Sequence, residues 1–152
     1  MEEEFKFNHF MPAQIRFSDV DQFGHMNNSV YFSLYDLAKT TYFKDVFGMA
    51  EWGEQVVVVA NINANFYQPV FFSDEMEIAT TAVQLGNKSF TLLQRAVAKN
   101  TGEVNSNCKK LMHGFSNALS ENPRASGSLG HAGARVSKNF ITFIEATQKN
   151  KY

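Results

Sequence analysis

Residues 16–31 read R-F-S-D-V-D-Q-F-G-H-M-N-N-S-V-Y and form the densest group of polar, chemically capable side chains in the chain. The last part of this segment, Asn-Asn-Ser at positions 27–29, consists of favourable N-cap residues for a helix. From Ser29 to Phe47, apolar side chains recur at spacings of three and four residues, as on one face of an amphipathic helix. Gly48 is well placed to end that helix. The sequence therefore predicts a long helix over Ser29–Phe47, preceded by a polar loop.

Runs of β-branched and apolar residues on both sides of this helix predict strands. They cover residues 10–17, 56–67, 75–85, 89–98 and 104–115. Gly86-Asn87-Lys88 is a hairpin signal and Asn100-Thr101-Gly102 supplies the next turn, so we expect an antiparallel meander. Pro12 indicates that the first strand lies at a sheet edge or starts with a bulge.

The chain has 152 residues, close to the roughly 150 of a typical domain, so we expect one domain over residues 1–152. The apolar spacing in Val136–Ile144 predicts a short C-terminal helix. Residues 120–135 are rich in glycine and serine and poor in large apolar residues, which indicates a flexible loop. The order of strand, long helix, four strands and short helix predicts an α+β fold in which one sheet buries the long helix.

Composition excludes several classes of partner and compartment. A net charge of -1 leaves no basic surplus to neutralise a nucleic-acid backbone. Cys108 is the only cysteine in the sequence, which excludes an intramolecular disulfide and suits a reducing compartment. The longest apolar run, residues 56–60, is far shorter than the roughly 20 residues that cross a bilayer. We therefore expect a cytoplasmic protein that binds neither nucleic acid nor a membrane.

The polar loop and the helix start together suggest acyl-transfer chemistry. A helix N-terminus presents unpaired backbone N–H groups and partial positive charge, which can polarise a carbonyl oxygen. Asp21, a few residues earlier, could act as a general base or as a nucleophile toward the carbonyl carbon. A purely structural interpretation is equally open at this point, because Asp19, Asp21 and Asn27 could simply bind backbone N–H groups in an Asx-rich turn that caps the helix.

Other chemistries fit the sequence poorly. The run that begins at Asp19 starts like a calcium loop, but Val30 stands where the bidentate glutamate is required. His25 has no H-x-x-x-H partner, so a zinc site is not expected. No G-x-S-x-G motif is present, and Cys108 lies within a predicted strand, where a small buried residue is the better interpretation.

The run D-V-D-Q-F-G-H-M-N-N-S-V-Y, residues 19–31, resembles a known family signature. It is similar to D-x-D-x-x-G-H-x-N-N-x-x-Y, the signature of the hotdog-fold acyl-CoA thioesterases of the 4-hydroxybenzoyl-CoA thioesterase type. The resemblance covers residues 10–117, and the glycine-rich residues 121–135 depart from it. It implies a hotdog fold, in which an antiparallel sheet of about five strands wraps around one long helix.

The resemblance implies roles for individual residues of the loop. Asp21 falls on the catalytic carboxylate, with direct attack and activation of water both left open. Gly24 turns the loop into the helix, and the backbone N–H of Asn28 polarises the thioester carbonyl. His25 is a candidate substrate contact, whereas Asp19 is expected to brace the loop.

The resemblance also implies how the substrate is held. Residues 88–110 carry a net charge of +4, which suits the phosphates of coenzyme A. The expected coenzyme contacts are Lys88, Ser89, Lys109 and Lys110. Coenzyme A would be part of the substrate, with no separate cofactor and no metal.

The implied activity is hydrolysis of an acyl-CoA thioester to a free acid and a thiol by a homodimer or a dimer of dimers. Two alternatives remain at the level of sequence, a non-hydrolytic acyl-thioester binding protein and a hotdog dehydratase. The identity of the acyl chain, and the choice between coenzyme A and an acyl carrier protein, are left open by the sequence.

Overall fold

The computed structural model describes residues 5–47, 58–85 and 89–113. These residues form five strands, one long α-helix and a short 3-10 helix, η1. In chain order the elements are β1 (His9–Ala13), η1 (Phe17–Asp19), α1 (Asn28–Phe47), β2 (Val58–Phe66), β3 (Met76–Leu85), β4 (Ser89–Ala98) and β5 (Val104–His113).

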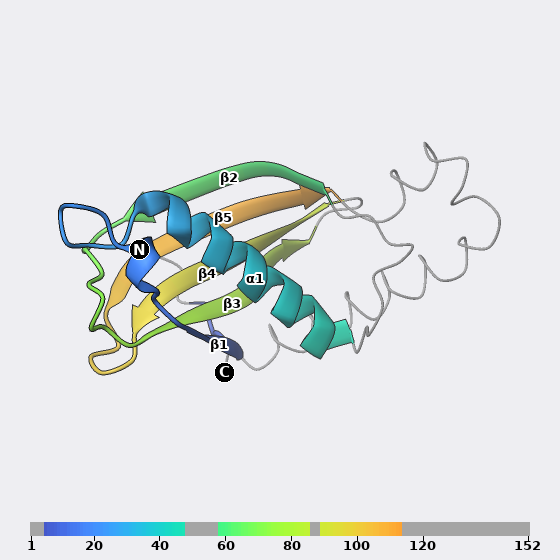
Figure 1. Cartoon of the computed structure of the whole chain (residues 1–152). Coiled ribbons are helices and arrows are strands. Elements are labelled where there is room, and N and C mark those ends of the chain that lie inside the picture. The colour runs from blue at the N-terminus through green and yellow to red at the C-terminus, as the bar shows by residue number, and fades with distance from the viewer. Residues whose placement is uncertain (1–4, 48–57, 86–88, 114–152) are drawn as a thin grey trace.

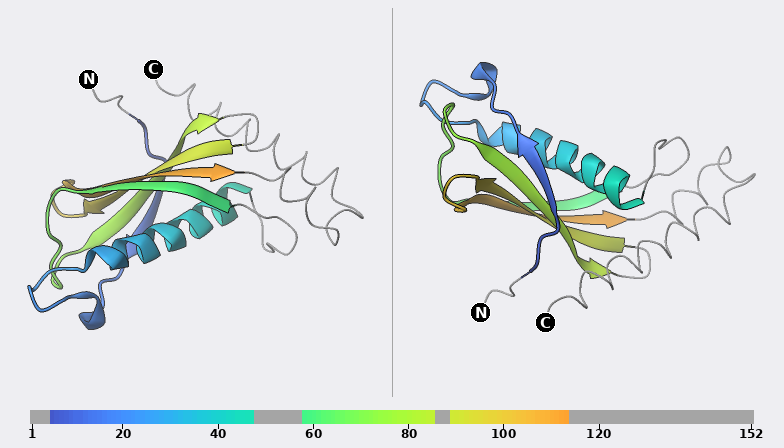
Figure 2. Two further views of the ribbon diagram at one scale, coloured as in Figure 1. Left: turned by 90° about the horizontal axis from the view of Figure 1, so that it is seen from above. Right: turned by 90° about the horizontal axis from the view of Figure 1, so that it is seen from below.

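The strands form one antiparallel sheet in the order β1-β3-β4-β5-β2. Helix α1 lies across one face of this sheet, and the loop before it projects beyond the sheet at one end (Figure 1). Seen from above and from below, the sheet is twisted and α1 runs along it (Figure 2). This arrangement confirms the predicted α+β hotdog fold.

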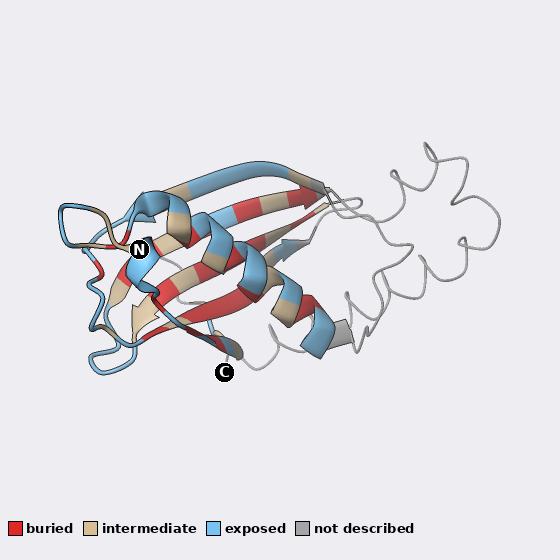
Figure 3. Ribbon diagram, in the orientation of Figure 1, coloured by how far each residue is buried: buried red, intermediate tan, exposed pale blue. Residues whose placement is uncertain are grey.

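The core lies between α1 and the helix-facing side of the sheet. Tyr31, Tyr35, Ala38 and Tyr42 recur along the helix at spacings of three and four residues and are buried. Ile78, Ala96 and Cys108 of the sheet belong to the same buried cluster as Tyr31, Tyr35 and Ala38, and Figure 3 shows buried positions along the strands beside the helix. Each large apolar side chain buried in this way contributes about 1.5–3 kcal/mol, so the packed face of α1 determines where the helix lies.

Most predicted element boundaries agree with the structure to within two residues. The helix begins at Asn28, one residue earlier than expected, and strand β4 spans the predicted residues. Pro12 lies in an edge strand, as its missing N–H requires. Strand β1 ends at Ala13 and does not reach residue 17, because η1 forms at Phe17–Asp19.

The path of β2 was not foreseen from the sequence. Strands β3, β4 and β5 form the expected meander, but β2 pairs with β5 at the far side of the sheet and not with its neighbour in sequence, β3. The helix end at Gly48, the hairpin tip at residues 86–88, the loop at 120–135 and the short C-terminal helix lie outside the described residues. Within the described ranges, no helix has the length and apolar character needed to cross a membrane.

Candidate active site

Asp19 organises the loop between β1 and α1. Its carboxylate accepts hydrogen bonds from the Arg16 backbone N–H at 2.8 Å and from the Arg16 guanidinium at 3.0 and 3.2 Å. Its carbonyl oxygen accepts the N–H of Asn27 at 2.9 Å. The side chain of Asp19 is only 5% exposed. Asp19 therefore joins the beginning of the loop to the start of the helix.

The Arg16 guanidinium determines the charge state of Asp19. Its hydrogen bonds hold the pKa of the Asp19 carboxyl below the usual range, although burial acts in the opposite direction. Asp19 is thus a charged carboxylate at neutral pH, and each of its two oxygens accepts at least one hydrogen bond from Arg16.

Asp21 stands in a tight turn between two paired residues, Val20 and Met26. Its N–H donates to the His25 carbonyl at 3.1 Å, and its own carbonyl accepts the Gly24 N–H at 3.0 Å. Gly24 has a φ of +85°, a conformation that favours glycine, and this closes the turn. The turn holds the half-buried Asp21 in a defined position at its start.

The carboxylate of Asp21 is only partly used by the turn. Oδ1 accepts the Phe23 N–H at 2.8 Å, which fixes the side chain. Among the residues that the structure describes, Oδ2 accepts no hydrogen bond. One oxygen is therefore held while the other is available to a substrate or a water molecule.

The backbone amides around the start of α1 are nearly all bound. Met26 donates to the Val70 carbonyl at 2.7 Å and Asn27 to that of Asp19. The Ser29 N–H binds the side-chain oxygen of Asn27 at 2.9 Å, which makes Asn27 the N-cap residue. The N–H of Asn28, in contrast, has no hydrogen-bond partner within the described residues. This free donor lies at the positive end of the helix dipole.

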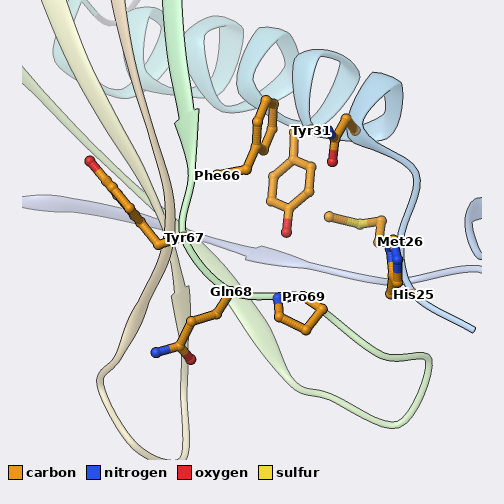
Figure 4. A pocket seen from close by; sticks show the side chains of 8 residues that line it. His25, Met26, Tyr31, Phe66, Tyr67, Gln68 and Pro69 are labelled. Atoms are coloured by element: carbon orange, nitrogen blue, oxygen red, sulfur yellow. The ribbon is translucent and has the colours of Figure 1, made fainter.

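A pocket of about 180 Å³ opens at the start of α1, and Asn28 is one of its lining residues. Its walls come from the loop before α1, from the first turn of α1 and from the end of β2 with the segment after it (Figure 4). The lining residues are His25, Met26, Asn28, Tyr31, Phe66, Tyr67, Gln68 and Pro69. The structure thus brings the predicted His25 and Asn28 to one cavity, whereas Asp21 is not among the residues that line it.

Two aromatic rings form the inner wall of the pocket. Tyr31 and Phe66 pack edge to face with ring centroids 5.1 Å apart, and Figure 4 shows the Tyr31 ring reaching down beside Phe66. Burial, together with the nearby charge of Asp74, raises the pKa of Tyr31 to about 12. Its hydroxyl therefore stays protonated at neutral pH and can donate a hydrogen bond.

The outer wall is held by β5. Asn105 is buried, and its carbonyl accepts the N–H groups of Tyr67 and Gln68 at 2.8 and 3.2 Å. Its side-chain amide donates to the Pro69 carbonyl at 3.4 Å. The segment after β2 thus has a fixed position relative to the sheet, although it has no regular secondary structure of its own.

The sequence model of the thioesterase-like superfamily matches residues 15–132, which is more than half of the chain. The chain belongs to this superfamily. The uncharacterized protein YsmA of Bacillus subtilis (strain 168) is 33% identical over 86 residues. That match covers 57% of this chain and 58% of YsmA, so the chain spans less than two thirds of this relative.

Solved structures of thioesterases have the same fold as this member of the superfamily. A thioesterase from Thermus thermophilus, crystallised with coenzyme A and Zn, is 26% identical with a TM-score of 0.64, over 74% of this chain and 87% of that one. A 4-hydroxybenzoyl CoA thioesterase variant complexed with 4-hydroxybenzoyl CoA is 20% identical with a TM-score of 0.64. That alignment covers 69% of this chain and 81% of the other, and at this identity it shows the fold alone.

The coenzyme contacts expected for this thioesterase-like chain are distributed over different places. Lys109 is exposed on β5, Ser89 is half-buried at the start of β4, and Lys88 lies outside the described residues. The expectation for Lys110 is wrong. Its side chain is 0% exposed, and its ammonium group lies under α1 at 2.7 Å from Asp36 Oδ1, so it cannot reach a phosphate in solution.

Neither a metal site nor a nucleophilic cysteine is found in the described part of this thioesterase-like chain. No three His, Cys, Asp or Glu side chains gather there as metal ligands. Burial raises the pKa of the Cys108 thiol to about 11, so at neutral pH Cys108 is a protonated, buried side chain.

Sequence reasoning missed most of the pocket wall. Phe66, Tyr67, Gln68 and Pro69 reach the pocket because β2 pairs with β5 and the chain then turns toward the loop before α1. The available signal was Pro69, because proline cannot donate to a strand ladder and so indicates that the chain leaves the strand just before it.

We predict that Asp19→Asn destabilises the protein and makes its free energy of unfolding less dependent on pH in the acid range. The carboxylate is held charged in the folded state, so its contribution is complete above the unfolded pKa of about 3.9 and is lost as pH falls through the lower folded value. At pH 7 the variant should lose about 1–3 kcal/mol, the scale of a hydrogen bond to a charged group. Urea unfolding at pH 7, 5 and 3 measures this difference. Equal pH dependence in the two proteins would contradict the assignment.

Proposed function

We propose that this protein is an acyl-CoA thioesterase, an enzyme that hydrolyses an acyl thioester to a free acid and a thiol. The observation that supports the proposal best concerns Asn28: this residue begins α1 and lines the pocket, and its N–H is free within the described residues while the neighbouring amides are bound. Membership in the thioesterase-like superfamily and the likeness to a coenzyme A-bound thioesterase agree with it.

In the proposed reaction, the thioester carbonyl oxygen accepts the Asn28 N–H. The positive end of the helix dipole stabilises the negative charge that develops on this oxygen as the carbonyl carbon is attacked. A preorganised donor of this kind contributes roughly 10²–10³ in rate, because it needs no reorganisation at the moment of reaction.

Asp21 supplies the second part of the chemistry through its free Oδ2. As a general base it takes a proton from water while the water oxygen attacks the carbonyl carbon, and the thiolate leaves with its bonding electrons. As a nucleophile it forms an anhydride and releases the thiolate, and water then cleaves the anhydride to regenerate Asp21. Both routes consume one water molecule for each thioester and give the same products.

The dehydratase alternative finds little support in the structure. Such a reaction needs a histidine and an acid that act together, but Asp21 and His25 interact only through their backbones. The His25 ring stacks on Phe23 with centroids 6.3 Å apart. A non-hydrolytic binding protein would use the same pocket and the same free amide. Only a measurement of thioester hydrolysis therefore distinguishes it from the enzyme.

We predict that Asp21→Asn abolishes hydrolysis and leaves substrate binding intact. The amide keeps the size of the side chain and can still accept the Phe23 N–H, but it cannot serve as an efficient base or nucleophile. The rate should fall by about 10²–10⁴, the usual contribution of general-base catalysis. Thiol release from a panel of short, long and aromatic acyl-CoA substrates measures kcat and KM.

Asp45→Asn is the matched control for this experiment. It makes the same substitution at an exposed carboxylate near the other end of α1, where the partner is His9. The control should keep the wild-type rate. Wild-type thiol release by Asp21→Asn would overturn the role of Asp21, and the absence of hydrolysis by the wild-type protein on every substrate would favour the binding protein.

We propose that Lys109 binds the phosphates of coenzyme A. It is exposed on β5, in a part of the chain that carries a net charge of +4 over residues 88–110. An ammonium group there raises the affinity for a phosphate in both the ground state and the transition state.

We predict that Lys109→Ala raises KM a few-fold and leaves kcat nearly unchanged, the pattern of lost uniform binding. The effect should shrink at high salt, because salt screens exposed charges. Lys99→Ala is the control, since Lys99 carries the same charge on the same segment but lies 3.9 Å from Glu75. An equal rise of KM in both variants would mean that only the overall charge matters.

We further propose that the protein is a homodimer or a dimer of dimers that uses the edge of β2. This strand of nine residues is the last in the sheet, and no other described strand pairs with its outer edge. Ile62 and Phe66 on this strand are 42% and 38% exposed, and Phe32 of α1 packs against Phe66 while 37% exposed. Ile62, Phe66 and Phe32 lie beside this outer edge, and we call these three apolar side chains the seam.

We predict a mass of at least twice 17.2 kDa by light scattering at micromolar concentration. Ile62→Lys should shift the protein toward the monomer, because a lysine in the seam opposes burial and edge pairing. A wild-type protein that is monomeric at these concentrations would contradict a shared interface.

A further inference from the structure

Two long polar side chains are buried beneath the middle of α1. Gln94 lies on β4 and Lys110 on β5, and both are 0% exposed. Each occupies the helix-facing side of its strand, where the positions two residues away are apolar: Leu92 and Ala96 on β4, Cys108 and Met112 on β5. Burying such groups is costly unless they are hydrogen-bonded. The donor groups of both side chains have partners, whereas Gln94 Oε1 is buried and accepts no hydrogen bond from the described residues.

Their partners are consecutive residues of the helix. Gln94 Nε2 donates to the backbone carbonyl of Tyr35 at 2.9 Å and also to Thr80 Oγ1 at 3.2 Å. Lys110 Nζ donates to Asp36 Oδ1 at 2.7 Å. Two neighbouring strands therefore bind one point of α1 through directional contacts. We name the Gln94–Tyr35 and Lys110–Asp36 contacts the polar clamp.

We propose that Gln94 and Lys110 are positioning residues for thioester hydrolysis, because the polar clamp fixes α1 along its axis and so places the Asn28 N–H in the pocket. This inference rests on the proposed function. Neither residue lines the pocket, so neither touches the reacting atoms. The clamp acts through the helix.

The physical argument concerns sliding of the helix along the sheet. Apolar packing is non-directional and tolerates small shifts, whereas a hydrogen bond weakens steeply when its length or angle changes. In the Lys110–Asp36 pair the ammonium group is buried and the carboxylate is more than half exposed, so the pair adds little net stability and its value lies in fixing the register between α1 and β5. A clamp at a single point of α1 therefore determines its axial position better than the apolar face alone.

The helix transmits this position to the pocket. Asn28 precedes Tyr35 by seven residues, which corresponds to about 11 Å at a rise of 1.5 Å per residue. The intervening turns are continuous α-helix, so a shift at the clamp moves the Asn28 N–H by nearly the same amount. A misplacement of about 1 Å in a catalytic donor can cost roughly 10²-fold in rate.

The experiment compares Gln94→Met and Lys110→Met with Lys39→Met. The first two remove the donors of the clamp and keep the length of the side chain. Lys39 also donates to Asp36 Oδ1, at 3.1 Å, but it belongs to α1 itself and cannot hold the helix on the sheet. We expect kcat to fall about tenfold or more in the clamp variants, KM to change less than twofold, and Lys39→Met to match the wild type.

A second measurement does not depend on activity. The backbone amide NMR signal of Asn28 should shift in Gln94→Met and Lys110→Met, and stay in place in Lys39→Met. If the wild-type protein hydrolyses no thioester, the proposed function fails while this signal still tests the clamp. Unchanged kcat and an unchanged Asn28 signal in both clamp variants would overturn the inference, as would an equal kcat loss in Lys39→Met.

Asp36 offers a variant pair in case Lys110→Met does not fold. The Asp36 side chain is 58% exposed, so its substitution does not open the core. Asp36→Asn keeps an oxygen that can accept the Lys110 hydrogen bond, whereas Asp36→Leu removes it. We expect kcat and the Asn28 signal to be kept in the first variant and lost or shifted in the second. Identical behaviour of the two variants would overturn the role of Lys110.

Discussion

The candidate site depends on where helix α1 begins. Successive residues of an α-helix are rotated by about 100°, so a start one residue later would turn a different N–H toward the pocket. The start is fixed from three directions: the Asn27 side chain caps Ser29, the Asp19 carbonyl binds the Asn27 N–H, and the Val70 carbonyl binds Met26. Within the described residues these contacts leave the amide of Asn28 free, and Asn28 is one of the residues that line the pocket.

Asp19 and Asp21 are separated by a single residue but have different environments. The difference follows from the shape of the loop. Asp19 points back toward β1, where the Arg16 guanidinium and backbone use both of its oxygens. Asp21 stands in the turn that Gly24 closes, where only Oδ1 is bound. A carboxylate whose two oxygens are both hydrogen-bonded within the loop braces that loop, and its lowered pKa makes it a weak base. The local backbone thus separates the structural acid from the one available for chemistry.

The sequence predicted those parts of the molecule that local patterns determine. The helix and the β3–β4–β5 meander follow from spacing and turn residues, and N-cap preference limited the cap to residues 27–29, of which the structure uses Asn27. The position of β2 beside β5 depends on a long-range pairing that no local pattern encodes, and the wall at Phe66–Pro69 depends on it in turn. Lys110 shows a signal that was present but not used. It shares its strand parity with the apolar Cys108 and Met112, which indicates the helix-facing side, whereas Lys109 has the opposite parity.

Strand β5 connects the two sides of the pocket. Near its start, Asn105 holds the segment after β2, and Ser106 Oγ donates to the Asn65 carbonyl at 2.8 Å. Near its end, Lys110 holds α1 through Asp36. Side chains of β5 therefore hold both the outer wall and the helix that carries the Asn28 N–H. This strand is itself paired with β4 on one edge and with β2 on the other. Because hydrogen bonds from this one strand reach both walls, the distance between the segment after β2 and α1 depends on the sheet as well as on the loop that supplies His25 and Met26.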